Sequence, residues 1–405
     1  MKTWFPVLCV SAGALFPTPP LQTENQQRLY AEQAHRAKQA SHQATHKLLN
    51  FLQTKEFRQE LQACCAEMAE LSSPEILRRI RAEFRAAELA HAFPSVIPAD
   101  DHFHDVTVDE LSRLDFFPNQ WQVPLMRGGT EFPVNFNKAE EGIFGLAPFS
   151  NDSVPTWTEA AERLVYVALN QRQLDHGSMT SFGEVGAIFS HSAARDMVLI
   201  APVDTGAFTS TCNVSNFTVN SSHHFSRWTF ACDEYWNPRT VGTFDHFDHI
   251  IYDSFGLWTA ANTSLAQEAG AFLRRSSFAG KYVDLPQTNT SDAFKYPESN
   301  IVGNPRFPDG LSLLIGGFAE LFGSDQGREL QRLAHNHSLP LAWSLGTAGE
   351  SSDNHHGHNH SHNHSHNHSH NGSFHFNSTA ITFPGNQRIL DPRVSREALN
   401  VTVPS

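Results

Sequence analysis

The positions of apolar side chains divide the sequence into a helical first quarter and a longer mixed region. After Thr23, the stretch ENQQRLYAEQAHRAKQASHQATHKLLNFL contains no proline or glycine, which favours one long helix. Further on, Ile76, Ile80 and Phe84 fall on one face at helical spacing, behind a Ser-Pro-Glu start. We therefore predict helices from Thr23 to Phe93, which form a helical hairpin or a three-helix segment.

From Pro94 onward the pattern changes, because prolines, aromatic residues and glycines become frequent and short β-like runs separate the loops. The runs predicted as strands cover residues 184–189, 196–200 and 249–252. Three other stretches have a helical pattern: TEAAERLVYVALNQR, DGLSLLIGGFAELFG and DQGRELQRLA. The predicted fold class is α+β, with the N-terminal helical segment packed on a mixed α+β body.

The two ends of the chain differ from this body. The first residues, MKTWFPVLCVSAGALF, combine one lysine, a short apolar run and an Ala-Gly-Ala sequence, which is typical of a secretory signal peptide. A mitochondrial presequence and a short buried strand are the alternatives. No later run reaches the roughly 20 apolar residues that a membrane-spanning helix needs. The predicted segments are a signal peptide at 1–14, a helical region at 15–94, the α+β body at 95–345, a disordered His-rich tract at 346–380 and a polar C-terminal tail at 381–405.

The composition and net charge argue against one class of function, nucleic-acid binding. The 405 residues are 40% hydrophobic, enough for a buried core, and 42 acidic against 29 basic residues give a formal net charge of −13. A nucleic-acid-binding surface needs basic residues to neutralise phosphates, so we expect no nucleic-acid partner. The 24 histidines would move the net charge toward zero on moderate acidification.

Acceptor sites for N-linked glycans are frequent along the chain. Thirteen Asn-x-Ser/Thr sequences occur, and four of them lie in the His-Asn-His-Ser repeat. Together with the signal peptide they predict a secreted eukaryotic glycoprotein that carries N-linked glycans. The acceptor asparagines are Asn151, Asn213, Asn216, Asn220, Asn262, Asn289, Asn336, Asn359, Asn363, Asn367, Asn371, Asn377 and Asn400.

The cysteines agree with secretion. Removal of Cys9 with the signal peptide would leave four cysteines, an even number that suits an oxidising compartment. Cys212 and Cys232 enclose a polar segment rich in glycan acceptor sites, and we predict a disulfide bond between them. Cys64 and Cys65 are neighbours on a predicted helix, where a bond between them would be strained, so buried free thiols are the alternative there.

The sequence NHHGHNHSHNHSHNHSHNGSFHFNST has the most conspicuous composition in the chain. It has no apolar residue to bury until Phe374, so it predicts a disordered segment. Alternating imidazoles on a flexible chain can bind Zn²⁺, Cu²⁺ or Ni²⁺. Slippage of a short repeat, without a role in metal binding, is the alternative. The candidate ligands of the tract are His355, His356, His358, His360, His362, His364, His366, His368 and His370.

Two shorter clusters, DDHFHD and FDHFDHIIYD, place histidines beside carboxylates and predict a second metal site if the fold brings them together. In the alternative interpretation the second cluster is an exposed lead-in to the strand predicted at 249–252. The candidate ligands are His102, His104, Asp245, His246, Asp248 and His249.

Four stretches in order, RLVYVALN, SFGEVGAIF, RDMVLIAPVDTG and HIIYDSFG, carry a resemblance to known proteins. Over about residues 160–256 the chain resembles a family of uncharacterised, mainly bacterial proteins of unknown function. It departs from that family where Pro-Val-Asp-Thr-Gly replaces Gly-Asp-Ser, and the later strand lacks a glutamate found there. The order of strands in the family is loosely similar to that of ADP-ribosyltransferase-like toxins. The matching positions are Tyr166, Ala168, Leu169, Asn170, Phe182, Gly183, Arg195 and Asp204.

Three functions remain open from the sequence. The first is a secreted, N-glycosylated protein that binds divalent metal ions through the His-rich tract. The second is a secreted enzyme, metal-dependent or ADP-ribosyltransferase-like, whose pocket would contain Arg127, Asn170, Glu184, Asp204 and the run from Asp245 to His249. The third is a cell-surface interaction glycoprotein without catalysis. An enzyme would gather these polar side chains in one place, whereas an interaction protein would scatter them.

Overall fold

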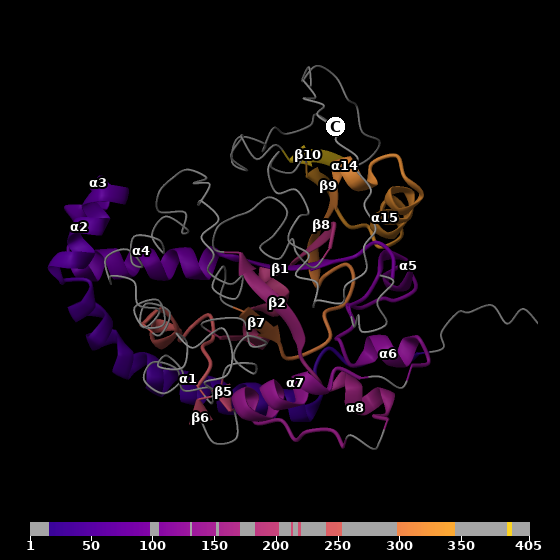
Figure 1. The fold of residues 1–405 in the computed structure, drawn as a ribbon, viewed down its shortest axis with the longest axis horizontal. Helices are drawn as coiled ribbons and strands as arrows, with labels where there is room; N and C mark the ends of the chain where they lie inside the picture. The colour runs from indigo at the N-terminus through magenta and orange to yellow at the C-terminus, as the bar shows by residue number, and fades with distance from the viewer. Residues whose placement is uncertain are drawn as a thin grey trace, which may run out of the picture.

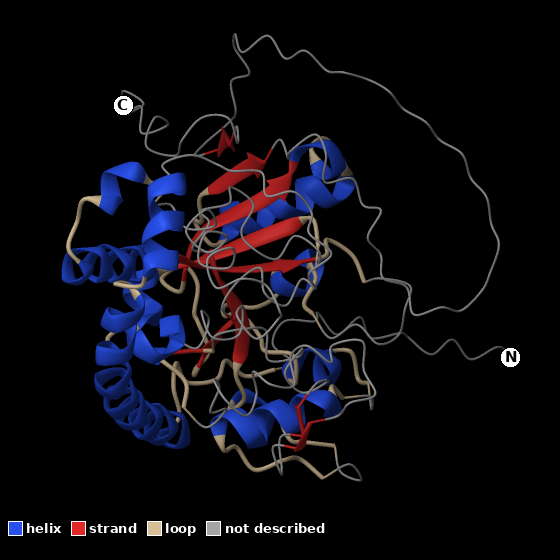
Figure 2. Ribbon diagram, turned by 60° about the vertical axis from the view of Figure 1, so that its left-hand side comes forward, coloured by secondary structure: helices blue, strands red, loops and turns tan. Residues whose placement is uncertain are grey.

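The computed structural model of the chain describes residues 16–97, 105–129, 132–150, 154–170, 183–201, 212–213, 218–219, 240–252, 298–344 and 387–390. These residues combine an N-terminal group of helices with one large mixed sheet and further short helices around it (Figures 1 and 2). The predicted α+β class is confirmed. No helix in the described ranges is long and apolar enough to span a bilayer.

The N-terminal group contains four helices: α1 (Glu24–Phe51), α2 (Lys55–Cys64), α3 (Ala66–Ala69) and α4 (Ser73–Ala86). Thr23 begins α1 with a capping box, because its hydroxyl accepts from the Gln26 amide and the Gln26 side chain accepts from the Thr23 amide. Thr54 caps α2 with an extended backbone, and its hydroxyl accepts from the Phe57 amide. The helices predicted after Thr23 and behind the Ser-Pro-Glu start are therefore present as α1 and α4.

The sheet has eight described strands in the order β10-β9-β8-β3-β1-β2-β7-β4. The strands from β8 to β4 pair antiparallel with their neighbours, whereas β8, β9 and β10 run parallel. The strands are β1 (Glu88–Phe93), β2 (Val165–Asn170), β3 (Val185–Phe189), β4 (Val198–Ile200), β7 (Glu298–Ile301), β8 (Leu311–Gly317), β9 (Leu341–Ser344) and β10 (Gln387–Leu390). A separate two-stranded pair consists of β5 (Cys212–Asn213) and β6 (Thr218–Val219).

Shorter helices connect and flank the strands (Figure 1). One of them is a π-helix, η1, which continues directly from α7. Such turns are rare in proteins, and many of those known lie at functional sites. These helices are α5 (Val108–Leu111), α6 (Gln122–Met126), α7 (Val134–Ala139), η1 (Glu140–Phe144), α8 (Trp157–Ala161), α9 (His191–Ala194), the 3₁₀-helix η3 (Arg195–Met197), α14 (Phe318–Leu321) and α15 (Asp325–Asn336).

Several predicted elements differ from the structure. The helix predicted up to Phe93 ends at Ala86, and the next residues form the central strand β1. The helical interpretations of the stretches that contain β2 and β8 are wrong, because each holds a short helix and a strand. In each case pairing on both sides of the strand overrides a local sequence that is compatible with a helix. The strand predicted at 249–252 is also wrong, since residues 248–252 are helical.

The strand predicted at 184–189 is confirmed as β3. The strand predicted at 196–200 is confirmed as β4, although its first two residues belong to the 3₁₀-helix η3. The helix predicted for DQGRELQRLA is confirmed as α15. The region predicted as a polar tail contributes β10, which pairs in parallel register with β9. Residues 345–386, which include the whole predicted His-rich tract, therefore connect two neighbouring strands in the chain order.

The two faces of the sheet differ in what they carry. One face supplies large apolar side chains such as Leu89, Phe93 and Val167, which belong to the main core together with residues of α1 and α4. The other face has small separate clusters, one of them made by Ala92 and Ala168 alone. Because successive strand residues point to opposite faces, this second face is lined by small and polar side chains in its middle strands.

Candidate functional site

The candidate site is a set of polar side chains on the second sheet face, named here the polar strip and consisting of Glu88, Tyr166, Asn170, Glu298 and Asn300. Strands β1, β2 and β7 lie side by side and supply all five. Glu88 pairs opposite Asn170, and Tyr166 pairs opposite Asn300. Glu298 pairs opposite Ala168, between the other two rows, so the register places the five side chains on one face.

Four of the five members of the polar strip are buried although they are polar, and Glu88 is partly exposed. Tyr166 and Glu298 are each 5% exposed, and Asn170 and Asn300 are 0% exposed. Burying a polar group without full hydrogen bonding costs free energy, so apolar residues usually fill such positions. The neighbours on the same face, Ala90 and Ala92 among them, are small instead, and leave the polar groups as the largest features of this part of the face.

Hydrogen bonds within the strip join carboxylates to carboxamides. The Asn170 side-chain amide donates to Glu88 at 3.5 Å, and the Asn300 amide donates to Glu298 at 3.2 Å. The Asn300 Oδ1 atom is buried and has no hydrogen-bond partner in the described part of the chain. An unpaired buried acceptor is costly, at about 1–3 kcal/mol, and a donor from a bound molecule would remove that cost.

Glu140 extends the strip beneath Tyr166. It is the first residue of η1, is fully buried, and lies with its carboxylate 2.8 Å from Arg163 Nη1. It also accepts from Trp121 Nε1 at 3.0 Å and from the Tyr166 hydroxyl at 3.5 Å. Burial raises the pKa of Glu140 to about 7, against the opposing effect of Arg163 and these donors.

The electrostatics of Tyr166 follow from the same burial. Desolvation raises the pKa of Tyr166 well above its usual value, and the nearby carboxylates of Glu140 and Glu298 raise it further. The phenol is therefore a proton donor at neutral pH. Tyr166 also packs against Phe136 of α7 in a tilted arrangement, with ring centroids 4.8 Å apart, which holds the ring at this end of the strip. A carboxyl group that can exchange a proton near neutral pH beside a neutral phenol is suited to general acid–base chemistry.

The structure separates the residues that the sequence grouped as an enzyme pocket. Asn170 belongs to the polar strip. Glu184 comes directly before β3, whereas Asn170 pairs with Glu88 at the other end of β1. The two positions are six residues apart along the strand direction, or about 20 Å. There Glu184 accepts a hydrogen bond from the Ser95 amide at 3.0 Å. Asp204 lies outside the described residues.

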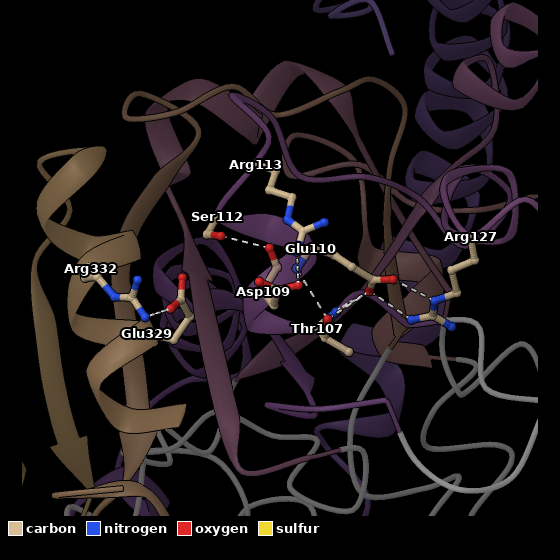
Figure 3. A network of polar contacts seen from close by, with 8 residues as sticks. All are labelled: Thr107, Asp109, Glu110, Ser112, Arg113, Arg127, Glu329 and Arg332. Atoms are coloured by element: carbon tan, nitrogen blue, oxygen red, sulfur yellow. Dashed lines mark hydrogen bonds and ion pairs between the residues drawn. The ribbon is translucent and has the colours of Figure 1, made fainter. Parts of the chain in front are cut away.

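Arg127 belongs to a different network, drawn in Figure 3. Its guanidinium donates to both carboxylate oxygens of Glu110, at 2.7 and 2.9 Å, and to the Asp105 carbonyl at 2.8 Å. Glu110 also completes the capping box of α5 with Thr107. Figure 3 shows the side chains of Arg127, Glu110 and Thr107 directed toward one another, so Arg127 holds α5 in place. The Arg127 guanidinium already binds the Glu110 carboxylate with two hydrogen bonds.

Two carboxylates of the predicted second metal site form ion pairs with different arginines. Asp245 pairs with Arg195 at 2.6 Å, and Asp248 binds Arg81 on the other side of the segment. His249 is buried, and burial lowers its pKa to about 4. Within the described ranges no group of three or more histidine, cysteine or acidic side chains gathers at metal-binding distance. His102 and His104 fall outside those ranges, so a site that includes them stays a prediction.

Other predicted sites fall largely outside the described residues. The histidines of the tract lie there, as do Cys232 and most glycan acceptor sites. Cys212 contributes only its backbone, in β5, to the description. Among the acceptor sites, Asn213 is described only by its backbone in β5, and Asn336 is the last residue of α15 and is exposed, as an acceptor asparagine must be.

The sequence did not indicate Tyr166, Glu298 and Asn300 as a group. Tyr166 stood out only through the family resemblance, and the polar start of β7, Glu-Ser-Asn, is short enough to read as a loop. A buried pair formed by His91 and Asp105 was missed as well. His91 Nδ1 lies 2.7 Å from the Tyr166 carbonyl, and its Nε2 lies 3.4 Å from Asp105 beside a cavity of about 10 Å³, room for one water molecule.

Comparison with known proteins does not assign the site. No protein-family model matches the chain, and none of the curated protein sequences is significantly similar to it.

Proposed function

We propose that this protein is an enzyme that binds a polyhydroxylated small molecule, a sugar or a ribosyl group, on the polar strip and cleaves or transfers its glycosidic bond. The observation that carries the proposal is the buried, unpaired Oδ1 of Asn300 beside the Glu298 carboxylate. Hydroxyl groups of a sugar are donors that can satisfy both atoms at once. Small neighbouring alanines favour a flat ring above the strands.

The reaction class follows from the acids. Cleavage at an anomeric carbon passes through an oxocarbenium-like transition state, which a carboxylate stabilises, and a second carboxyl group serves as acid or base. In the proposal Glu298 stabilises the positive charge that develops on the ring. Glu140, whose pKa is raised to about 7, exchanges a proton through the Tyr166 hydroxyl.

The loose likeness to ADP-ribosyltransferase-like toxins points to the same chemistry. Transfer of an ADP-ribosyl group also breaks a bond at the anomeric carbon of a ribose. The matching positions Tyr166, Ala168 and Asn170 all lie on the strip face of β2, by the alternation of the strand. This placement supports the enzyme over a non-catalytic surface protein, for which no such grouping is needed.

Activity assays on the full-length protein test the proposal. The protein would be incubated with NAD⁺ and with nitrophenyl glycosides, and release of nicotinamide or nitrophenol would be followed. Replacement of Glu298 by glutamine should lower kcat at least about 100-fold while the melting temperature stays within a few degrees. Asn300→Ala should mainly raise KM. The matched control is Glu67→Gln, an exposed glutamate on α3, which should leave both values unchanged.

Two results would contradict this function. One is the absence of turnover with every substrate together with no rise in melting temperature on adding nicotinamide, ribose or monosaccharides. The other is equal activity in the Glu298→Gln variant and the unchanged protein. Either would favour the non-catalytic interaction glycoprotein.

Metal binding is a second proposed function, favoured by the repeated histidines of the tract. We infer that the protein is secreted, carries N-linked glycans and binds Zn²⁺, Cu²⁺ or Ni²⁺ through the nine tract histidines from His355 to His370. Imidazoles at alternate positions of a flexible segment can wrap around such ions. This property concerns binding and requires no contribution from the polar strip.

A further inference from the structure

Helix α1 carries two exposed histidines one helical turn apart. His42 and His46 both lie well inside the regular helix, and both are exposed. Residues at i and i+4 lie on the same face with Cβ atoms about 5–6 Å apart. The inward face carries buried residues such as Ser41 and Leu48, so the two histidines point away from the core. Figure 2 shows α1 as a long helix at the periphery of the molecule.

The helix is held to the fold at two residues next to this pair, Ser41 and Thr45. The Asp248 amide donates to Ser41 Oγ at 3.1 Å, and Thr45 Oγ1 donates to the Asp248 carboxylate at 2.6 Å. These contacts fix the turn that contains His42 and His46 to the rest of the fold. Ligands on a rigid helix need little ordering before they bind an ion.

The His46 ring has a partner that orients it. Its Nδ1 lies 3.2 Å from the side-chain amide nitrogen of Asn50, Nδ2, one turn further along the helix. Histidines that bind metals commonly use one ring nitrogen for the ion and give the other to such a hydrogen bond. Because an amide can turn to present its oxygen, Asn50 can accept from Nδ1 and leave Nε2 free as a ligand.

We propose that His42 and His46 form a surface site for a divalent transition-metal ion, with one nitrogen of each imidazole as ligand. Imidazole suits Cu²⁺, Ni²⁺ and Zn²⁺, and the affinity for a given nitrogen site is highest for Cu²⁺. No third histidine, cysteine or acid joins the pair among the described residues, so water or an added ligand completes the coordination. The proposed site uses no residue of the polar strip or of the His-rich tract.

The experiment reads individual histidines, because the tract would dominate any measurement of total metal. The full-length protein would be treated with diethylpyrocarbonate, which modifies free imidazoles, at increasing Cu²⁺ or Zn²⁺, and each modified histidine would be quantified by peptide mass spectrometry. His42 and His46 should become protected together, with the same midpoint. His35 is the matched control, since it is exposed on the same helix and has Gln39 in place of a second histidine four residues later.

Variants make the outcome decisive. In His42→Gln, protection of His46 should require at least about tenfold more metal, and the reciprocal change should appear in His46→Gln. Gln39→His should bring protection to His35. The proposal fails if His46 is protected equally in the His42→Gln protein, or if His42 and His46 are protected no better than His35. Neither result bears on the polar strip, and a deletion of the tract should leave the paired protection in place.

Discussion

Replacement of Asp248 by asparagine tests whether this carboxylate is a structural link or a metal ligand. The Asp248 side chain is 5% exposed and accepts from Arg81 Nε at 2.8 Å and from Thr45 Oγ1 at 2.6 Å, with a second contact to Arg81 Nη2. Arg81 belongs to α4 and Thr45 to α1. One carboxylate thus joins two helices to the segment 240–252.

The expected loss can be worked from these contacts. Breaking a buried ion pair by removing one partner costs about 3–5 kcal/mol, because it leaves a charge without its partner. Arg81 keeps 32% of its side chain exposed, so water solvates the released guanidinium and reduces the penalty. The asparagine carbonyl can also still accept one of the hydrogen bonds. We expect Asp248→Asn to lower the free energy of unfolding by about 2–3 kcal/mol.

Urea unfolding of both proteins, followed by circular dichroism, measures this difference. The matched control is Glu75→Gln on α4, where Glu75 pairs with Arg78 at 2.6 Å in an exposed position. Exposed pairs contribute little to stability, so this variant should unfold at nearly the same urea concentration as the unchanged protein. Equal effects of the two substitutions would refute the structural role. An Asp248→Asn effect that vanishes in EDTA would instead show that the carboxylate binds a metal.

Three further predictions concern pH, glycans and the tract. Burial lowers the pKa of His249 from 6.5 to about 4, so its stabilising effect is complete above pH 6.5 and is lost as the pH falls toward 4. His249→Leu should therefore reduce the acid-induced loss of unfolding free energy by about 3 kcal/mol, measured by urea unfolding at both pH values. If the proposed secretion and glycosylation hold, enzymatic deglycosylation of the protein purified from its native source should lower its apparent mass, whereas an unchanged mass with an intact Met1 would contradict both. Deletion of His355–His370 should remove most Zn²⁺ or Ni²⁺ retention and leave the melting temperature within a few degrees; a large fall would show that the tract packs on the body.

The helices were the most predictable part of the fold. For α1 and α4 the sequence pattern is local, free of glycine in the helix interior, and the structure places their N-caps at Thr23 and Ser72. For α15 the helical spacing of apolar residues was sufficient although Gly327 lies in its first turn. The central strands were less predictable. The β1 sequence ELAHAF contains no helix breaker, and only its pairing with β2 and β3 makes it a strand.

The candidate site depends even more on tertiary structure. Glu88, Asn170 and Asn300 are far apart in the chain, and only the order and register of β1, β2 and β7 place them on one face. No spacing in the sequence encodes that neighbourhood. Asp248 is a second example: the sequence made it a candidate metal ligand, whereas in the fold its carboxylate forms an ion pair with Arg81.

The sequence by itself determined the α+β class and the helices of its N-terminal region, because helix periodicity and capping act over a few neighbouring residues. It even contained the spacing of His42 and His46, which needs only a helix to become a pair. The tertiary structure alone decided which strands are neighbours, which face of the sheet is polar and which carboxylates are already paired. Those properties arise from contacts between distant segments, and their free energy depends on burial that no local pattern specifies.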